Sequence, residues 1–316
     1  MVSIAVLDDY QYVAEGMANW SAIPNAAVTF FHDTLKDEDA LVARLEPFEI
    51  LATMRERTRL PASVLNRLPN LKVVAGTGAR QAHVSMEAAA RNGIVVCGTG
   101  GGGGSTTGEL AWGLIIALMK HIPDQDQAMR QGQWQKGLVS DMAGKTLGIM
   151  GLGRIGTQMA RIARALEMPV IAWSRTLTPE RAAEHDATYV SWDDLFSQSD
   201  VLTVHVPLSD VSRGWITARE LGLMKPTSYL INTSRGPIVQ EDALLDALRN
   251  LTIAGAGLDV YDEEPLPAGH PVLFLDNVVV TPHLGYATDE TLRRWYLGIV
   301  DNINAFLKGE PHNVLT

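Results

Sequence analysis

The sequence predicts an α/β fold built from two doubly wound domains. Short β-rich runs alternate with helix-patterned segments along the 316 residues, and strands separated by helices require right-handed crossovers and mostly parallel sheets. A glycine-rich run at 98–104 interrupts this alternation, and a chain of this length usually forms two domains. We therefore place a domain boundary at that run.

The first part of the chain forms one expected α/β unit, with helix patterns such as 37–45 and 86–91 between its strands. Its expected strands are 3–7, 27–31, 50–53, 71–75 and 94–97. The second part has helix patterns such as 154–166 and 240–249. Its expected strands are 146–150, 170–174, 201–204, 228–231, 253–258 and 278–281. The long helix pattern 289–307 comes last, and we expect it to return to the first unit.

The start of the second part resembles a capping box. Thr106 is followed three residues later by Glu109, directly before the apolar stretch 110–119. In a capping box the first side chain accepts a hydrogen bond from the helix backbone and the second reaches back to the cap. We therefore expect Thr106 to be the N-cap of this helix.

The segment Gly151-Leu152-Gly153-Arg154-Ile155-Gly156 predicts a dinucleotide site. It follows the apolar run 146–150 and opens a helix-patterned stretch, so a strand passes into a helix at the glycines. Glycine permits the tight turn and lets backbone N–H groups approach a pyrophosphate, which the N-terminus of the helix also favours. This context makes the motif much more specific than the glycine spacing alone.

Composition excludes several other classes of protein. The net charge of −10 argues against nucleic acid as a partner, and no apolar run reaches the roughly 18 residues of a membrane span. The N-terminus has no basic region of a secretory signal, and Cys97 as the single cysteine suits a reducing cytoplasm. No residues have metal-ligand spacing, so we expect no metal. We expect a cytoplasmic enzyme that acts on a small molecule.

Three expected strands of the second part end in chemically useful side chains. Arg235 follows the strand 228–231, the carboxylates of 259–264 follow 253–258, and His283 follows 278–281. Each residue alone is more often structural, as a capping arginine, an acidic loop or a hydrogen-bonded histidine. Because parallel strands place their carboxyl ends at one edge, where open α/β sheets bind ligands, we expect these side chains to converge.

With these motifs the chain resembles the D-isomer-specific 2-hydroxyacid dehydrogenases. The resemblance covers nearly the whole chain and is most specific at 151–156, 205–208, 232–239, 257–265 and 281–285. It implies catalytic roles for Arg235, Glu264 and His283. It also implies the following cofactor-binding residues: Thr107, Gly151, Gly153, Arg154, Ile155, Gly156, Ser174, Arg175, Thr176, His205, Pro207, Thr233, Asp259 and Gly285.

The resemblance also implies an architecture. A Rossmann-type dinucleotide-binding domain, 99–289, is inserted into a flavodoxin-like substrate domain made from 1–98 and 290–316. The family's usual homodimer would use the helix after Thr106.

The implied roles agree with the chemistry of the side chains. Reduction of a 2-oxo acid needs a hydride at the carbonyl carbon and a proton at its oxygen, and histidine titrates in the required range. Glu264 can fix the tautomer of His283 and favour its charged form, as the aspartate does in hydrolase triads. Arg235 can bind the substrate carboxylate through two parallel hydrogen bonds, which lysine would do less well.

Two segments depart from the family pattern. Where many members have G-x-G-x-D-N-I-D, this chain has Arg80 at the second aligned glycine and Ala82-His83 in place of Asp-Asn. The backbone of Gly78, Ala79 and Arg80 can still bind the substrate carboxylate. The Arg80 side chain either adds a charge for an anionic substrate tail or faces solvent.

The second departure concerns the cofactor. No acidic residue follows the strand 170–174, where NAD enzymes usually bind the ribose hydroxyls. Instead Ser174-Arg175-Thr176 resembles a pocket for a 2′-phosphate, so among the NAD(P) cofactors we favour NADP, with use of both as the alternative.

We therefore expect an NAD(P)-dependent oxidoreductase that interconverts a D-2-hydroxy acid and a 2-oxo acid, acting as a reductase of glyoxylate or hydroxypyruvate-like substrates. An NAD(H)-sensing binding module of the same fold is one alternative, although the chain lacks long basic or disordered extensions. A formate dehydrogenase-like enzyme is another, although that enzyme has glutamine where this chain has Glu264.

Overall fold

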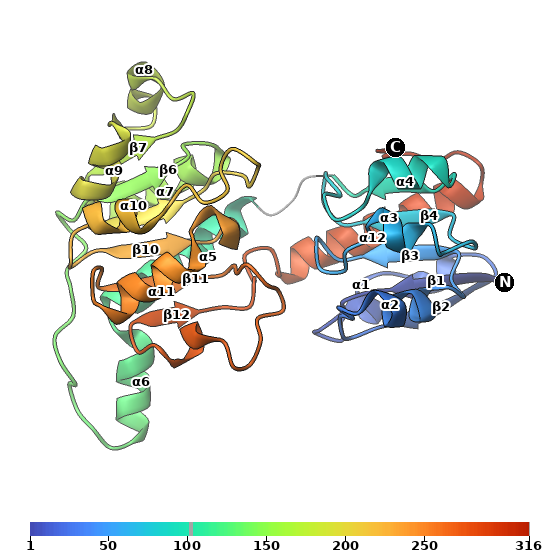
Figure 1. The fold of residues 1–316 in the computed structure, drawn as a ribbon, viewed down its shortest axis with the longest axis horizontal. Helices are drawn as coiled ribbons and strands as arrows, with labels where there is room; N and C mark the ends of the chain where they lie inside the picture. The colour runs from blue at the N-terminus through green and yellow to red at the C-terminus, as the bar shows by residue number, and fades with distance from the viewer. Residues whose placement is uncertain (101–103, 316) are drawn as a thin grey trace. The chain divides into compact units, whose positions relative to one another are not determined.

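The computed structural model describes residues 1–100 and 104–315. The chain divides into two compact units (Figure 1). Unit 1 consists of Met1–Gly102 and Ala287–Thr316, and unit 2 of Gly103–Tyr286. Each unit contains one parallel sheet covered by helices.

Unit 1 has a five-stranded parallel sheet in the order β2-β1-β3-β4-β5, which is the flavodoxin-like order. Its strands are β1 (Val2–Val6), β2 (Ala26–Phe30), β3 (Ile50–Thr53), β4 (Val73–Gly76) and β5 (Val95–Gly98). Its helices are α1 (Ala14–Met17), η1 (Trp20–Ala22), α2 (Glu38–Leu45), α3 (Ala62–Leu65), α4 (Met86–Arg91) and α12 (Asp289–Leu307). Every residue of β3 and β4 is buried, as expected for parallel strands covered on both faces.

The last helix belongs to unit 1, to which we expected the chain to return. Thr288 caps α12 by accepting a hydrogen bond from the Thr291 N–H group. Its apolar face, including Trp295, Ile299 and Ile303, is buried, and the helix packs near β4 and α1. The chain therefore leaves unit 1 after β5 and returns to it for α12.

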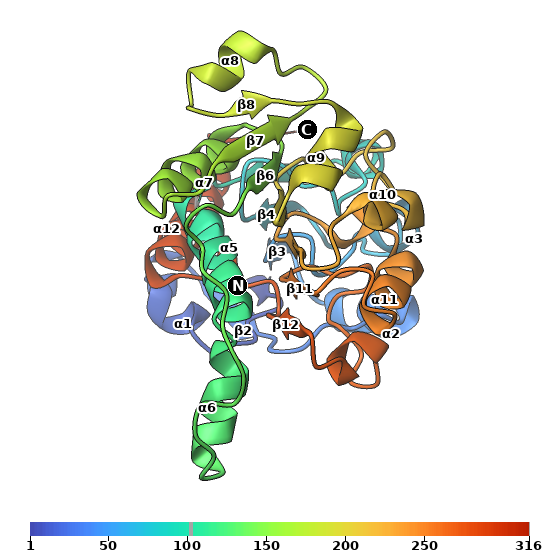
Figure 2. The ribbon, with the colours of Figure 1, turned by 90° about the vertical axis from the view of Figure 1, so that its left-hand side faces the viewer.

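Unit 2 has a seven-stranded parallel sheet in the order β12-β11-β10-β9-β6-β7-β8 (Figure 2). The strands are β6 (Leu147–Met150), β7 (Val170–Trp173), β8 (Thr188–Tyr189), β9 (Val201–Val204), β10 (Tyr229–Asn232), β11 (Gly255–Leu258) and β12 (Val278–Val280). The helices are α5 (Gly104–Met119), α6 (Ile122–Arg130), α7 (Arg154–Ala165), α8 (Pro179–Ala183), α9 (Trp192–Gln198), α10 (Ala218–Leu223), η2 (Gly236–Ile238), α11 (Glu241–Arg249) and η3 (Pro271–Phe274). This is a Rossmann-type sheet.

Alternate residues of the unit 2 strands face two hydrophobic cores, one on each side of the sheet. Ile149 packs with α5 and α7 on one face, and Met150 packs with α9, α10 and α11 on the other. The strand order reverses between β6 and β9, so a crevice is expected beyond the carboxyl ends of these two strands. The segments that follow these strands are the glycine motif and 205–208.

The expected capping box is wrong. Helix α5 begins at Gly104, so Thr106 lies inside its first turn. Its hydroxyl donates to the Gly285 carbonyl, 2.8 Å away, and the Thr107 hydroxyl donates to the same oxygen at 2.8 Å. A tertiary contact between segments far apart in the sequence has replaced the local cap.

Several elements of unit 2 were not named among the expectations, and two of them change its outline. The two-residue strand β8 extends the sheet beyond β7. Helix α6 extends away from the rest of unit 2, and a segment without regular structure, 131–146, leads from it back to β6 (Figures 1 and 2).

Candidate active site

The side chains predicted to converge follow three adjacent strands, β10, β11 and β12. Arg235 follows β10 as the residue before η2, Glu264 lies in the loop after β11, and His283 follows β12. Each is partly buried. The parallel register of the three strands places these segments at one edge of the sheet.

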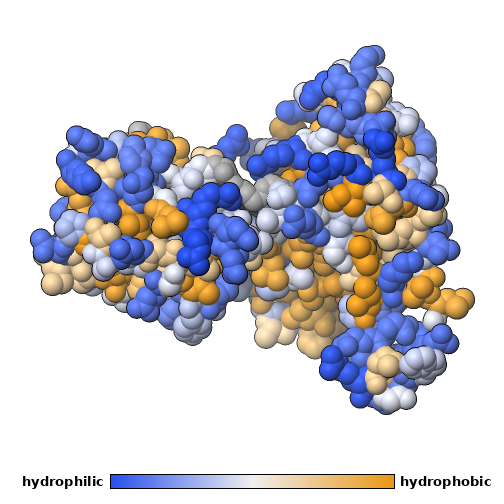
Figure 3. Space-filling model, turned by 180° about the vertical axis from the view of Figure 1, so that it is seen from behind, coloured by the Kyte–Doolittle hydropathy of each residue, from blue (hydrophilic) through white to orange (hydrophobic). Residues whose placement is uncertain are grey.

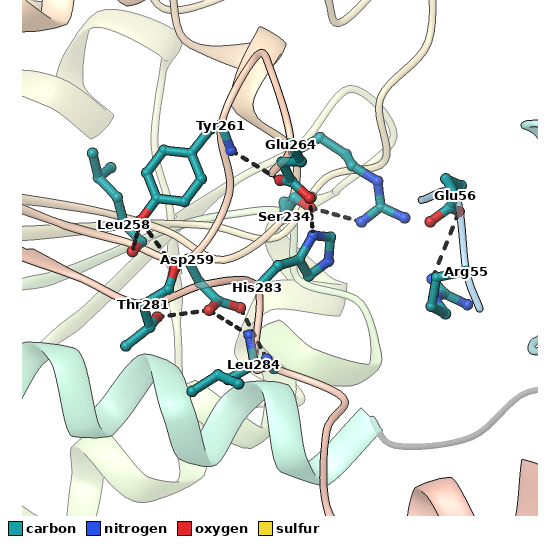
Figure 4. A network of polar contacts seen from close by, with 12 residues as sticks. Arg55, Glu56, Ser234, Leu258, Asp259, Tyr261, Glu264, Thr281, His283 and Leu284 are labelled. Atoms are coloured by element: carbon teal, nitrogen blue, oxygen red, sulfur yellow. Dashed lines mark hydrogen bonds and ion pairs between the residues drawn. The ribbon is translucent and has the colours of Figure 1, made fainter. Parts of the chain in front are cut away.

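Glu264 and His283 form an ion pair that is largely shielded from solvent (Figure 4). His283 Nδ1 lies 2.6 Å from Glu264 Oε2, and their side chains are only 11% and 18% exposed. Because a carboxylate only accepts hydrogen bonds, Nδ1 carries a proton and Nε2 is the atom left for other chemistry. The other carboxylate oxygen, Oε1, accepts the Tyr261 N–H at 3.0 Å.

His283 sits in a left-handed turn, with φ of 55°. This conformation is unfavourable for a residue other than glycine and needs support from neighbouring structure. Its N–H donates to the Thr281 carbonyl at 3.0 Å. Asp259 supports the following residues, because Oδ1 accepts from the Leu284 N–H at 2.7 Å and Oδ2 from the Gly285 N–H at 2.9 Å.

Asp259 is fully buried and also accepts the Thr281 hydroxyl at 2.6 Å. Burial raises the pKa of this carboxyl group, and its hydrogen bonds oppose that effect. Both oxygens are therefore already used by the 281–285 segment. In the described structure Asp259 orients the segment that carries His283.

The turn around Arg235 is built by its own polar neighbours. Asn232 is buried, donates to the Arg235 carbonyl at 3.0 Å and accepts the Ser234 N–H at 3.0 Å. The Ser234 hydroxyl donates to the Val206 carbonyl, which connects this turn to the segment after β9. The Arg235 guanidinium donates to the Ser234 carbonyl at 2.7 Å.

The glycine motif has the geometry of a nucleotide turn. Gly151 has φ of 99°, and a Cβ there would lie 2.8 Å from the His205 carbonyl oxygen. A Cβ at Gly156 would lie 2.2 Å from the Gly151 oxygen, so α7 can pack this closely only with glycine. Gly153 precedes α7, and a Cβ there would meet no atom of residues 1–100 and 104–315 within 4 Å. The space at the N-terminus of α7, where Arg154 and Ile155 begin the helix, is therefore open.

The residues after β9 lie beside this turn because β9 pairs with β6, and the residues after β10 lie one strand further along the same edge of the sheet. His205 Nε2 lies 2.9 Å from the Thr203 hydroxyl, and burial lowers the pKa of His205 to about 3. His205 is therefore neutral near pH 7. Pro207 accepts the Ser212 hydroxyl at 2.7 Å. The Thr233 hydroxyl is buried and has no hydrogen-bond partner among the described residues, which fits a site completed by a ligand.

The end of β7 carries Ser174, Arg175 and Thr176, of which Arg175 and Thr176 are exposed. Within residues 1–100 and 104–315, Arg175 has no ion-pair partner. It lines a shallow surface pocket of about 510 Å³ together with Trp173, Trp192 and Trp215. The rings of Trp173 and Trp192 meet edge to face at 4.5 Å.

In unit 1, the loop after β4 contains the predicted substrate residues. The Gly78 N–H donates to the Thr99 hydroxyl at 2.9 Å, and the Gly78 carbonyl accepts the Thr99 N–H at 3.0 Å. Gly78 is therefore engaged within the unit. The N–H groups of Ala79 and Arg80, both exposed, have no acceptor in the described part of the chain.

His83 in the same loop is buried, and burial lowers its pKa to about 4. It is neutral near pH 7 and replaces a polar residue of the family pattern without adding charge.

No group of three or more His, Cys, Asp or Glu in residues 1–100 and 104–315 could hold a metal ion. Over the same residues, no helix is long and apolar enough to cross a membrane.

The similarity of this chain to known proteins agrees with the geometry of unit 2. The family profile described as the NAD binding domain of D-isomer-specific 2-hydroxyacid dehydrogenases matches residues 112–285. A glyoxylate reductase of Aeropyrum pernix is 39% identical over 81% of this chain and 80% of its own length. The chain belongs to the D-isomer-specific 2-hydroxyacid dehydrogenase family. Its members are oxidoreductases that act on small hydroxy and oxo acids.

Other members match along the whole chain. A hydroxypyruvate reductase of Blautia hydrogenotrophica is 31% identical over 99% of both chains. A crystal structure described as a phosphoglycerate oxidoreductase of Vibrio cholerae O395 superposes with a TM-score of 0.92, at 36% identity, covering 98% of this chain and all of that one. The similarity therefore includes both units.

Sequence reasoning missed the residues that hold the site together. Thr281 and Tyr261 both contact the segments of Glu264 and His283, yet their types indicate ordinary strand-end and core positions. Of these two residues, only Tyr261 could have been singled out from the sequence, because a buried tyrosine hydroxyl usually needs a hydrogen-bond partner.

Proposed function

We propose that this protein is a reductase of small 2-oxo acids, of the glyoxylate or hydroxypyruvate type, that uses a nicotinamide cofactor with a preference for NADP. The observation that carries this proposal is the ion pair of His283 and Glu264, 2.6 Å apart and mostly shielded from solvent, at the ligand-binding edge of the sheet. The pair leaves His283 Nε2 to give a proton to a substrate oxygen.

Each proposed role follows from the geometry of one side chain. Glu264 holds the Nδ1 proton of His283 and favours the charged imidazolium, which is the proton donor in reduction. Arg235 supplies a planar guanidinium for the substrate carboxylate. A bound nicotinamide cofactor supplies the hydride.

The substrate contacts of unit 1 are also part of the proposal. The N–H groups of Ala79 and Arg80 have no described acceptor, so they are suited to bind a carboxylate. The Gly78 N–H is donated to Thr99, so we assign Gly78 the role of shaping this loop.

The proposed cofactor site is the open space before α7. Gly153→Ala tests it, because a methyl group there meets no atom of the described residues within 4 Å but would occupy the space of the pyrophosphate. The backbone at Gly153 has φ of −93°, which alanine tolerates, so the melting temperature should stay unchanged while the Kd for NADPH rises about tenfold or more. Gly222→Ala is the matched control, since it also meets no atom within 4 Å. Equal NADPH affinity for both variants would contradict the site.

The preference for NADP rests on Arg175. A 2′-phosphate brings about −1.5 to −2 charges, by analogy with other phosphate monoesters, and Arg175 is an exposed arginine without an ion-pair partner in the described chain. Arg175→Ala should raise the KM for NADPH at least tenfold and leave the KM for NADH within about twofold. Because Trp173 lies beside Arg175 in the same pocket, quenching of tryptophan fluorescence gives Kd values independent of activity. Equal changes for the two cofactors would refute the role of Arg175.

The substrate class is tested by a panel of 2-oxo acids with NADPH and with NADH. We expect the highest kcat/KM for small substrates such as glyoxylate, hydroxypyruvate or pyruvate, and D-configured products where the product is chiral. Cofactor binding without turnover of any 2-oxo acid would contradict the enzyme proposal and leave a binding module.

We further propose that the protein acts in the cytoplasm as a homodimer. Side chains of α5 are largely buried within unit 2, but α6 and the segment after it expose apolar groups (Figure 3). The exposed residues are Ile122, Met129, Trp134, Leu138 and Val139, of which Leu138 is 94% exposed. Exposed apolar side chains gathered on one helix and the segment that follows it suit contact with a second copy of the chain.

A further inference from the structure

Tyr261 touches each of the three segments that carry Arg235, Glu264 and His283. Its backbone N–H donates to Glu264 Oε1 at 3.0 Å. Its hydroxyl lies 2.9 Å from the Thr281 carbonyl oxygen, which also accepts the His283 N–H. Its peptide packs so closely on Gly236, the residue after Arg235, that a Cβ on Gly236 would lie 2.1 Å from the Tyr261 carbonyl carbon.

The hydroxyl of Tyr261 joins two strand ends. It is within 3.2 Å of the Leu258 carbonyl at the end of β11, besides its contact with Thr281 after β12. Burial, followed by the charges of Asp259 and Glu264, raises the pKa of the phenol, so the hydroxyl keeps its proton and can only donate to these carbonyls. The residue therefore does not exchange protons with substrate.

Neither carbonyl depends on Tyr261 for its only hydrogen bond. The Leu258 oxygen also accepts the Thr281 N–H at 2.9 Å, and the Thr281 oxygen also accepts the His283 N–H at 3.0 Å. Loss of the hydroxyl therefore leaves no buried acceptor unsatisfied. The loss removes the contact through which the hydroxyl joins Leu258 at the end of β11 to Thr281 after β12.

We propose that Tyr261 is a positioning residue that fixes Glu264 and His283 relative to each other, through its backbone on one side and its hydroxyl on the other. The effect of this positioning on catalysis rests on the proposed function. The left-handed turn at His283 makes the restraint necessary, because an unfavourable backbone conformation persists only where surrounding contacts hold it. When the Thr281 end is less restrained, the 2.6 Å pair of His283 and Glu264 lengthens on average.

The variant that isolates the hydroxyl is Tyr261→Phe, which keeps the ring and the backbone N–H. Tyr229→Phe is the matched control, because Tyr229 begins β10 at the opposite end of the sheet and its hydroxyl has no hydrogen bond among the described residues. The first readout is the pH dependence of 2-oxo acid reduction. The second is the titration of the His283 imidazole by NMR without substrate, with His283→Gln used to assign the signal.

The groups that face His283 and enter its titration come from several elements. Glu264 contacts the ring directly, Asp259 at the end of β11 interacts with its charge, and the Tyr286 ring lies 5.5 Å away. Tyr261 follows β11 and Arg235 follows β10 at the same edge of the sheet. Tyr261→Phe leaves every one of these charges in place. A change in titration therefore reports the geometry of the His283–Glu264 pair.

For Tyr261→Phe we expect kcat to fall about 3- to 10-fold, which corresponds to one neutral hydrogen bond. Since a longer pair favours the imidazolium less, both the pH–rate midpoint and the NMR midpoint should move measurably to lower pH. The melting temperature and the Kd for NADPH should match those of Tyr229→Phe.

Unchanged midpoints in Tyr261→Phe would overturn the proposal, whether or not kcat falls. A fall of more than about 10 °C in melting temperature with an unmoved NMR midpoint would also overturn it, because the residue would then be only structural. The NMR titration needs no substrate. If no 2-oxo acid is reduced by the parent protein, the proposed function fails while the positioning inference is still decided.

Discussion

Replacing Glu264 by glutamine removes one charge from the centre of the proposed site with almost no change in shape. The two carboxylate oxygens accept from two different donors, the Tyr261 N–H at 3.0 Å and His283 Nδ1 at 2.6 Å. An amide has only one oxygen, so one of these donors must lose its acceptor. Glu264→Gln therefore removes both the charge and one hydrogen bond.

The expected magnitude follows from the distance and the burial of the pair. A charge-assisted hydrogen bond contributes about 1.5–3 kcal/mol, which corresponds to a fall in kcat of about 10- to 100-fold if it is needed in the transition state. The variant also removes a negative charge next to the imidazole, and that charge favours the protonated ring. Because the side chains are only 11% and 18% exposed, solvent screens the interaction between the two groups weakly.

The assay is the pH dependence of kcat for reduction of the best 2-oxo acid. Reduction needs the protonated imidazole, so the rate falls as pH rises, and without the carboxylate this fall should begin at lower pH. Glu263→Gln is the control, because it removes the same charge from the exposed neighbouring residue. A Glu264→Gln profile that coincides with that of Glu263→Gln would refute the role of the ion pair.

Three other predictions concern the cofactor turn, acid stability and assembly. Gly151→Ala should lower the free energy of unfolding in urea by about 2 kcal/mol or more, since φ is 99° and its Cβ would lie 2.8 Å from the His205 oxygen; equal stability to the parent would contradict this. His83 is 8% exposed, and its pKa is lowered to about 4. The free energy of unfolding should therefore fall by about 3 kcal/mol as the pH falls from 6.5 to 4. In urea titrations, His83→Gln should reduce this dependence of stability on pH. Leu138→Asp should convert the proposed dimer to a monomer in light scattering, whereas Leu251→Asp, which changes an exposed leucine elsewhere, should not.

The order of strands and helices could be predicted from the sequence, because it depends on the regular spacing of apolar residues. Alternating strands and helices predict parallel sheets, and parallel strands bring Arg235, Glu264 and His283 to one edge without knowledge of any distance. The glycines at 151 and 156 indicate a close approach that the structure shows at their Cβ positions. Local pattern and global fold agree at these points.

The hydrogen bonds that support the site could not be predicted from the sequence, because they join residues far apart in it. Thr106 has the local pattern of an N-cap, but its hydroxyl donates to Gly285, 179 residues later. Gly78 donates to Thr99, and Tyr261 contacts Thr281, 20 residues on. Hydrogen bonds of this kind depend on the final packing of the loops, for which no short pattern exists. The left-handed conformation of His283 is likewise set by its surroundings.

The most direct test of the central claim compares the parent protein with His283→Gln. Turnover of the best 2-oxo acid and fluorescence-detected binding of NADPH are measured on the same samples. If His283 gives the proton, kcat should fall about 10²- to 10⁴-fold in the variant while the Kd for NADPH stays within about twofold. A His283→Gln variant that turns over at the rate of the parent protein would contradict the account.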